Sequence, residues 1–114
     1  MNKYKHNVFT DIIYGKIKCK EVYSDDNVLA FYDINPQAEI HVLVIPKGNY
    51  CNFQDFIENA SNEIVLGFFK TINKIIYILQ LEENGYKLIT NQGIDGGQEI
   101  DHFHMHILGG KKLK

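Results

Sequence analysis

Three histidines occur at every second position near the C-terminus, at His102, His104 and His106. Because side chains alternate across a β-strand, the three imidazoles are expected on one face and the apolar residues between them on the other. Packing does not require a row of imidazoles, and the chain has only five histidines. Imidazole, with an unperturbed pKa of about 6.5, can act near neutrality as nucleophile, general acid, hydrogen-bond donor or metal ligand. The pattern therefore indicates phosphoryl transfer or metal binding.

For phosphoryl transfer, His104 is the best-placed nucleophile because His102 and His106 can flank it. A ring nitrogen can attack phosphorus and form a phosphohistidine intermediate, provided that an acceptor such as a backbone carbonyl holds the other nitrogen. His41 could also orient this network. In the glycine-rich loop 92–98, Gly96-Gly97-Gln98 lets backbone N–H groups approach a phosphate closely. Because the chain contains no Arg, an anion site must use imidazolium, Lys or backbone N–H groups.

Metal binding is the alternative, because neutral histidines at strand spacing recur in zinc sites. Side chains two positions apart on a strand are separated by roughly 6.5 Å, whereas zinc ligands must all reach within about 2.1 Å of one point. A regular strand cannot easily bring all three imidazoles together, although two of them with His41 could bind a metal. We predict no metal and no other cofactor. His6 lies in a polar N-terminal segment and is expected to be solvated.

The surrounding elements predict an α+β domain with an antiparallel sheet. Apolar or alternating runs predict strands over 21–24, 28–32, 41–46 and 86–91, followed by the histidine strand. A short helix or turn is expected over 8–17. A long helix is expected from about Asp55 or Ser61 to Glu82, with Asn84-Gly85 as its stop signal. Its apolar stripe is wide enough to pack on the sheet and on a second subunit.

Length and composition fit one domain over residues 1–114. The formal net charge of -2, with mixed signs, gives no basic footprint for nucleic acid, and no segment is continuously apolar enough for a membrane span. No signal sequence is evident, so we expect a cytoplasmic protein. Cys19 and Cys51 are expected to be free thiols.

The triad and its continuation Leu108-Gly109-Gly110 resemble the histidine triad (HIT) family, in particular its Hint branch of nucleotide-binding proteins. The stretches 11–17, 29–38, 41–47 and 91–97 are also similar, so the resemblance covers nearly the whole chain. It implies a HIT-like fold: a five-stranded antiparallel sheet with one long and one short helix, extended across a homodimer. It also implies a hydrolase of purine nucleoside phosphoramidates, an AMP-type phosphoramidase that works through a nucleotidyl-histidine and without a metal.

The same resemblance implies roles for individual residues. His104 is the nucleophile, and His102, His106 and His41 orient it and stabilise phosphate charge. Asp33 contacts the ribose hydroxyls. The phosphate is surrounded by Asn91, Gly97, Gln98 and Glu99, and the base by Ile13, Tyr14, Ile17, Phe31 and Ile34. From residue chemistry alone, these last five are expected to be core residues.

Three departures from the family pattern concern the leaving group and the triad. Glu99 stands where some relatives have Ser, a residue proposed to assist the leaving group, so the identity of the general acid stays open. Asp101 precedes the triad where an aromatic residue is usual. The chain ends at Lys114 without the longer tail of many relatives, which bears on substrate preference. Two further functions stay open: a nucleotide-binding regulatory module with little turnover, and a zinc-binding protein or zinc hydrolase.

Overall fold

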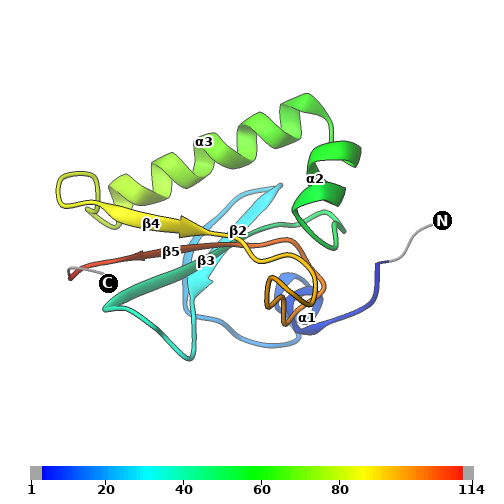
Figure 1. Ribbon diagram of the computed structural model, residues 1–114, viewed down its shortest axis with the longest axis horizontal. Coiled ribbons are helices and arrows are strands. Elements are labelled where there is room, and N and C mark those ends of the chain that lie inside the picture. Colours follow the sequence, from blue (N-terminus) through cyan, green and yellow to red (C-terminus); the bar gives the residue numbers. More distant parts are fainter. Residues whose placement is uncertain (1–3, 112–114) are drawn as a thin grey trace.

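A five-stranded antiparallel sheet forms the centre of the computed structural model, which describes residues 4–111 (Figure 1). Its strands are β1 (Glu21–Ser24), β2 (Val28–Tyr32), β3 (Ile40–Pro46), β4 (Tyr86–Ile89) and β5 (Met105–Gly109). They lie in the order β1-β2-β3-β5-β4, and every neighbouring pair is antiparallel. The last strand of the sequence is thus inserted between β3 and β4. The predicted α+β fold class with its five-stranded antiparallel sheet is confirmed.

Three helices begin at residues whose side chains cap them. Asn7 caps α1 (Val8–Ile13), Asn52 caps α2 (Phe53–Asn59) and Ser61 caps α3 (Asn62–Ile78). The helical pattern predicted from Asp55 or Ser61 onward is therefore two helices, because Ala60 takes an extended conformation with ψ 153°. The long helix also stops before the predicted Asn84-Gly85 signal, since Gln80 already has a left-handed φ of 58°.

The helices cover opposite faces of the sheet. Helices α2 and α3 lie over one face and α1 lies on the other (Figure 1). The larger core, on the α2 and α3 side, contains Phe103, Met105 and Ile107. The smaller core contains Phe9, Leu29, Phe31, Leu43 and Ile45. Because β3 contributes alternate residues to both cores, it is a strand covered on both faces, as its apolar sequence predicts.

The histidine segment is a strand over a shorter range than predicted. Only His106 lies within β5, which begins at Met105. Before it, the main chain turns, because the His102 N–H donates to the Ile100 carbonyl and the Phe103 N–H donates to the Tyr50 carbonyl. The alternation of faces nevertheless holds: the apolar residues enter the larger core, while His102 and His104 contact Phe9 of α1. In residues 4–111, no helix is long and apolar enough to cross a bilayer.

Candidate active site

His104 has one ring nitrogen held and the other free. Its Nδ1 lies 2.7 Å from the His102 carbonyl oxygen. Because a carbonyl only accepts, Nδ1 carries the proton and Nε2 carries the lone pair. The Thr90 hydroxyl donates to the His104 carbonyl at 2.8 Å, and the Phe9 ring packs edge-on against the imidazole at 5.1 Å. The residue has the geometry of a nucleophile.

The electrostatic environment keeps His104 neutral. Burial lowers the pKa of His104, whereas its hydrogen bond to the His102 carbonyl and the charges of Asp33 and Glu99 partly oppose that shift. The side chain is 8% exposed, so a small ligand can still reach it. A neutral imidazole with an accessible lone pair is the form that attacks phosphorus.

His102 is fully buried, and both of its ring nitrogens are occupied. Its Nε2–H donates to the Pro46 carbonyl at 2.8 Å, so its Nδ1 must accept, and it does so from the Tyr4 hydroxyl at 2.6 Å. Burial lowers the pKa of His102 to about 4. The expected role of His102 in orienting His104 agrees with this geometry. Its expected role in stabilising phosphate charge does not, because neither nitrogen is left to contact a ligand.

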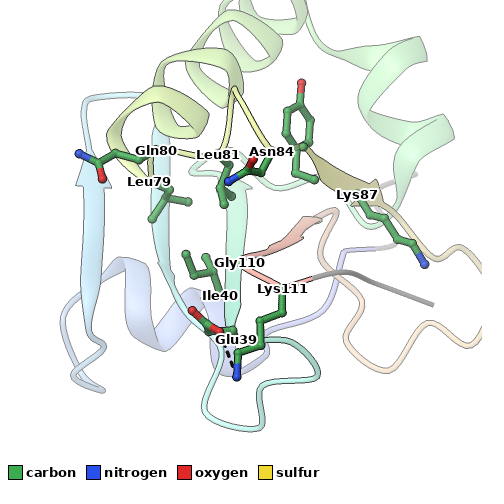
Figure 2. A pocket seen from close by; sticks show the side chains of 11 residues that line it. Glu39, Ile40, Leu79, Gln80, Leu81, Asn84, Lys87, Gly110 and Lys111 are labelled. Carbon is green, nitrogen blue, oxygen red and sulfur yellow. Dashed lines mark ion pairs between the residues drawn. The ribbon is translucent and has the colours of Figure 1, made fainter.

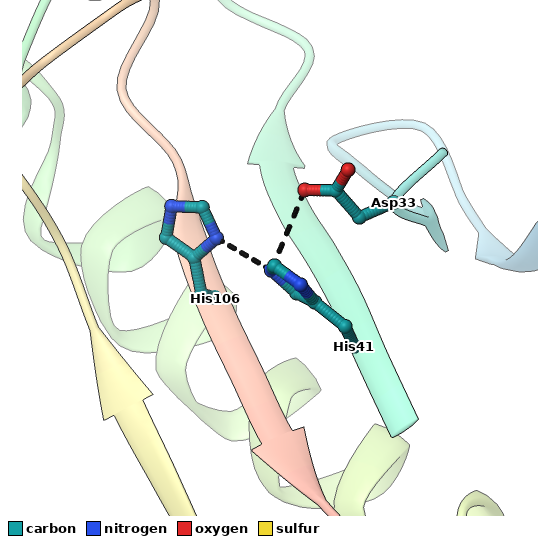
Figure 3. Close-up of side chains that lie close together, drawn as sticks. All are labelled: Asp33, His41 and His106. Carbon is teal, nitrogen blue, oxygen red and sulfur yellow. Dashed lines mark hydrogen bonds and ion pairs between the residues drawn. The ribbon is translucent and has the colours of Figure 1, made fainter. Parts of the chain in front are cut away.

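His41 and His106 form a second hydrogen-bonded pair (Figure 3). The Gln37 N–H donates to His41 Nδ1 at 3.1 Å, so the His41 proton lies on Nε2, 2.8 Å from His106 Nδ1. His106 Nδ1 therefore accepts, and its own proton lies on Nε2, the nitrogen that faces away from His41 in Figure 3. Main-chain geometry thus turns His106 into a hydrogen-bond donor.

Burial also keeps this second pair neutral. It lowers the pKa of His41, against the charge of Asp33, whose Oδ2 lies 3.4 Å from His41 Nε2. It lowers the pKa of His106 to about 4, with further lowering by His104 and His41. Asp33 itself is held by the Asn35 N–H, which donates to its Oδ1 at 2.8 Å.

Within the described residues, one group has the composition of a metal site. Ligand atoms of Asp33, His41 and His106 all lie within 4.8 Å of one another. To ligate through Nε2, however, His41 would need its proton on Nδ1, where the Gln37 N–H already points. His102 already uses both ring nitrogens in other hydrogen bonds, and the ligand group within 4.8 Å does not include His104. The donor set does not fit a metal ion without a main-chain rearrangement.

The glycine-rich loop is braced from within by amide side chains. Gln98 Nε2 donates to the carbonyls of Cys51 at 2.6 Å and Ile100 at 2.9 Å, and Gln98 Oε1 accepts from the Gly93 N–H. Asn91 Nδ2 donates to the Gly96 carbonyl at 2.8 Å. Both side chains thus shape the loop that was predicted to surround a phosphate. Gln98 has no N–H left for a ligand.

The loop is also too tight for larger residues. A Cβ at Gly96 would lie 2.2 Å from the Gln92 carbonyl oxygen, so only Gly fits at that position without a shift of the main chain. Glu99 follows the loop and is exposed, and its charge acts on His104.

The five residues expected around a base divide into two groups. Phe31 is 4% exposed and belongs to the smaller core, and Ile13 packs against that core. Three others, which residue chemistry alone predicted to be core, are exposed: Tyr14 by 71%, Ile17 by 42% and Ile34 by 91%. The core prediction was wrong for these three because each follows the end of a helix or strand. Ile34, which directly follows Asp33 in the chain, is exposed and therefore available to a ligand.

Several groups that position the histidines were not predicted from the sequence. They are the hydroxyls of Tyr4 and Thr90, the ring of Phe9 and the main chain of Gln37 and Pro46. The main-chain groups could not be recognised from the sequence, because almost every residue type has the same backbone N–H and carbonyl. Tyr4 lies 98 positions before its partner His102, so only the fold brings them together.

A hollow of about 640 Å³ lies away from the histidines (Figure 2). Ile40 and Gly110 are among its lining residues, and Lys111 and Glu39 form an ion pair of 3.6 Å beside it. Ile40 pairs with Gly109, whereas His106 pairs with Leu43, so the hollow lies at the far end of β3 and β5 from His104. It contains none of the histidines, and we place the functional site at the histidines.

Comparison with known proteins agrees with this geometry. The model of the HIT domain family matches residues 14–113. The chain belongs to the HIT domain family. An uncharacterised HIT-like protein of Rickettsia prowazekii (strain Madrid E) is 47% identical, over 96% of this chain and 91% of that protein. The HIT match begins after Ile13, so Tyr4, Asn7 and Phe9 lie outside it.

Two solved structures show the same HIT fold. A HIT family hydrolase from Legionella pneumophila Philadelphia 1 aligns over 96% of both chains with 36% identity and a TM-score of 0.89. A histidine triad nucleotide-binding protein from Candida albicans aligns over 94% of this chain and 82% of that one, with 28% identity and a TM-score of 0.78.

Proposed function

We propose that this HIT protein is a purine nucleoside phosphoramidate hydrolase of the Hint type, with a nucleotidyl intermediate on His104. The observation that carries the proposal is the hydrogen bond from His104 Nδ1 to the His102 carbonyl, which leaves the Nε2 lone pair free for attack. The hydrolase from Legionella pneumophila and the nucleotide-binding protein from Candida albicans, both similar in fold, support the reaction and ligand class.

In the first step, the Nε2 lone pair of His104 attacks the α-phosphorus and forms a P–N bond. The bond from phosphorus to the leaving nitrogen breaks, and its electron pair stays on that nitrogen. The leaving nitrogen takes a proton from Glu99, which must first take that proton from solvent because only its protonated form can donate. We assign Glu99 this role because it is exposed to solvent and because its charge, in the ionised form, acts on His104. The free amine then departs.

In the second step, water attacks the phosphorus and forms a P–O bond. The P–Nε2 bond breaks, its electron pair returns to His104, and the proton of water passes to Glu99. The products are a nucleoside monophosphate and the regenerated site. Such a route divides one difficult displacement into two easier ones.

Neutral donors would stabilise the charge that develops on the phosphoryl oxygens. The chain has no Arg, and the pKa values of His41, His102, His104 and His106 are all lowered. We assign this role to the His106 Nε2–H and to the backbone N–H of Glu99, with Asn91 and Gln98 holding the loop in shape. The N–H groups of Gly97 and Gln98 already donate to the carbonyls of Ile94 and Gly93, so Gly97 would shape the loop rather than contact the phosphate.

The nucleoside would lie beside Asp33. Its carboxylate is a suitable acceptor for ribose hydroxyls, and the exposed Ile34, Tyr14 and Ile17 offer an apolar surface to a base. Ile13 and Phe31 support that surface from the smaller core. We also propose a purine preference, which the Hint resemblance implies, and a cytoplasmic location.

We also propose that two copies assemble through the β4 edge. Strand β4 is at the end of the sheet, and its residues Tyr86, Leu88 and Ile89 are between 37% and 41% exposed. Leu66, Tyr77 and Ile78 of α3 are exposed as well. A strand at the edge of a sheet, together with exposed apolar residues, favours pairing with a second chain. Sedimentation equilibrium that gives a monomer at micromolar concentration would contradict this assembly.

The decisive experiment measures AMP release from adenosine 5′-phosphoramidate by the wild type and by His104→Ala, each with and without EDTA. We expect release that requires His104 and ignores EDTA, and AMP binding that survives the substitution. His6→Ala is the matched control, because the His6 side chain is 64% exposed. Release that EDTA abolishes would indicate a metal enzyme, and AMP binding without release would indicate a binding module.

A further inference from the structure

The N-terminal segment reaches the triad through one short hydrogen bond. The Tyr4 hydroxyl lies 2.6 Å from His102 Nδ1, and the two rings meet edge-on with their centroids 5.5 Å apart. The direction of the bond follows from the other ring nitrogen, because His102 Nε2–H is needed by the Pro46 carbonyl. Tyr4 is therefore the donor and His102 the acceptor.

Asn7 connects this contact to the first helix. Its Oδ1 caps α1 by accepting from the N–H groups of Phe9 and Thr10. Its Nδ2 donates to the Lys5 carbonyl at 3.1 Å, and to the Tyr4 hydroxyl oxygen and the Asp101 carbonyl, both at 3.3 Å. One side chain thus holds the start of α1, the Tyr4 hydroxyl and the residue before the triad.

Helix α1 then places Phe9 against the triad. The Phe9 ring lies edge-on to His102 at 5.9 Å and to His104 at 5.1 Å. A directed chain of hydrogen bonds therefore runs from Asn7 through Tyr4 and His102 to Pro46. This chain of hydrogen bonds fixes the position of His102, whose carbonyl accepts from His104 Nδ1.

We propose that Tyr4 is a positioning residue of the active site, which acts through the ring and carbonyl of His102 to aim His104 Nε2 at the substrate. The expected effect of Tyr4 on kcat rests on the proposed function, whereas its expected effect on the hydrogen bonds of His102 and His104 does not. Neither Tyr4 nor Asn7 lies in the range that the family model matches, which begins at residue 14. The residues proposed to position the triad thus include some that precede the range matched by the family model.

The chemistry of Tyr4 suits a permanent donor. Burial raises the pKa of Tyr4 above its ordinary 10.0, although hydrogen bonds with Asn7 and Thr10 oppose the shift. The hydroxyl therefore keeps its proton over the whole range in which the enzyme would work. Without that proton, His102 Nδ1 would be a buried acceptor lacking its donor.

The test compares Tyr4→Phe with Tyr23→Phe. Phenylalanine keeps the ring packing against His102 and removes only the hydroxyl. Tyr23 is the matched control because its hydroxyl also donates one short hydrogen bond, 2.8 Å to Asp25, at the β1–β2 turn. Hydrolysis of adenosine 5′-phosphoramidate is measured as kcat and KM separately. We expect kcat of Tyr4→Phe to fall about tenfold at unchanged KM, since one buried acceptor loses its donor, and Tyr23→Phe to retain wild-type values.

A second readout does not depend on turnover. Nitrogen-15 NMR of the histidine rings reports the hydrogen bond at each nitrogen, and exchange of the His104 Nδ1 proton reports its bond to the His102 carbonyl. We expect Tyr4→Phe to shift His102 Nδ1 toward the value of an unbonded nitrogen and to accelerate exchange at His104 Nδ1. Asn7→Ser, which keeps the helix cap but loses the amide donor, should show a smaller change of the same sign.

The two readouts separate failure of this proposal from failure of the proposed function. If the wild type hydrolyses no phosphoramidate, the function is wrong and NMR alone decides the role of Tyr4. The proposal is overturned if the His104 Nδ1 proton exchanges equally fast in Tyr4→Phe and wild type. A rise of KM without a fall of kcat would overturn it too, because Tyr4 would then act on binding rather than on the nucleophile.

Discussion

Stability should fall steeply in weak acid because His102 is buried in its neutral form. The pKa of His102 is about 4 in the folded protein, against 6.5 for an exposed histidine. Between these values the unfolded chain binds a proton that the folded protein does not. Unfolding is therefore favoured as the pH falls, so the stabilisation is fully present above pH 6.5 and is lost progressively down to pH 4.

The size of the effect follows from the same two pKa values. One pKa unit corresponds to about 1.4 kcal/mol, and the linkage relation gives a loss of about 2 kcal/mol from His102 between pH 7 and pH 5. His106, with a pKa also near 4, adds to the loss in the same direction. Because a small domain is stable by only about 5–15 kcal/mol, this is a large share of its stability.

The assay is urea unfolding at pH 7, 6 and 5, at one fixed protein concentration because assembly would otherwise change the midpoint. His102→Gln cannot titrate, so the wild type should lose about 2 kcal/mol more than this variant between pH 7 and pH 5. His6→Gln, at an exposed position, should follow the wild type. Equal losses in the wild type and His102→Gln would refute the assignment of a neutral buried His102.

Three further predictions concern the proposed catalysis. Because burial lowers the pKa of His104, the acid limb of the kcat/KM profile should lie below pH 6.5. The charge of Asp33 raises the pKa of His104, so Asp33→Asn should move this limb to still lower pH in a pH–rate profile. Gly96→Ala should reduce kcat/KM at least about tenfold, because its Cβ would meet the Gln92 carbonyl. Gly93→Ala is the milder change, because Gly93 has a φ of 71° but open space around a Cβ. It should cost only about 1–2 kcal/mol of stability in urea unfolding. Thr90→Val removes the donor to the His104 carbonyl and should lower kcat several-fold at unchanged KM in steady-state kinetics.

The sheet could be predicted because its strands are short apolar runs between clear turn signals. Asp25, Asp26 and Asn27 mark the first hairpin, and the Asp25 carboxylate does accept from the N–H groups of Asn27 and Val28. The alternation in the triad also predicted correctly which residues enter the larger core. These features are local, and local patterns are what a sequence shows most directly.

Non-local contacts account for most of what was missed. The start of β5 depends on where Phe103 bonds, and its partner Tyr50 is distant in the sequence. The break between α2 and α3 depends on two extended residues, Ala60 and Ser61, between two regions that each resemble a helix. Exposure of Tyr14 and Ile34 could not be distinguished from burial, because a ligand surface and a core patch have the same composition.

The tautomers of the histidines are set by main-chain groups rather than by other titratable residues. The carbonyls of Pro46 and His102 can only accept, and the Gln37 N–H can only donate. Each of these groups therefore fixes which nitrogen of one imidazole carries the proton. Because His41 Nε2–H donates to His106 Nδ1, the tautomer of His41 also fixes the tautomer of His106. A site built in this way offers one imidazole lone pair, on His104, and one imidazole N–H donor, on His106, at neutral pH. The proposed reaction uses neither a metal nor a guanidinium group, so under that proposal a substrate with a single negative charge at phosphorus would be matched better than a polyphosphate.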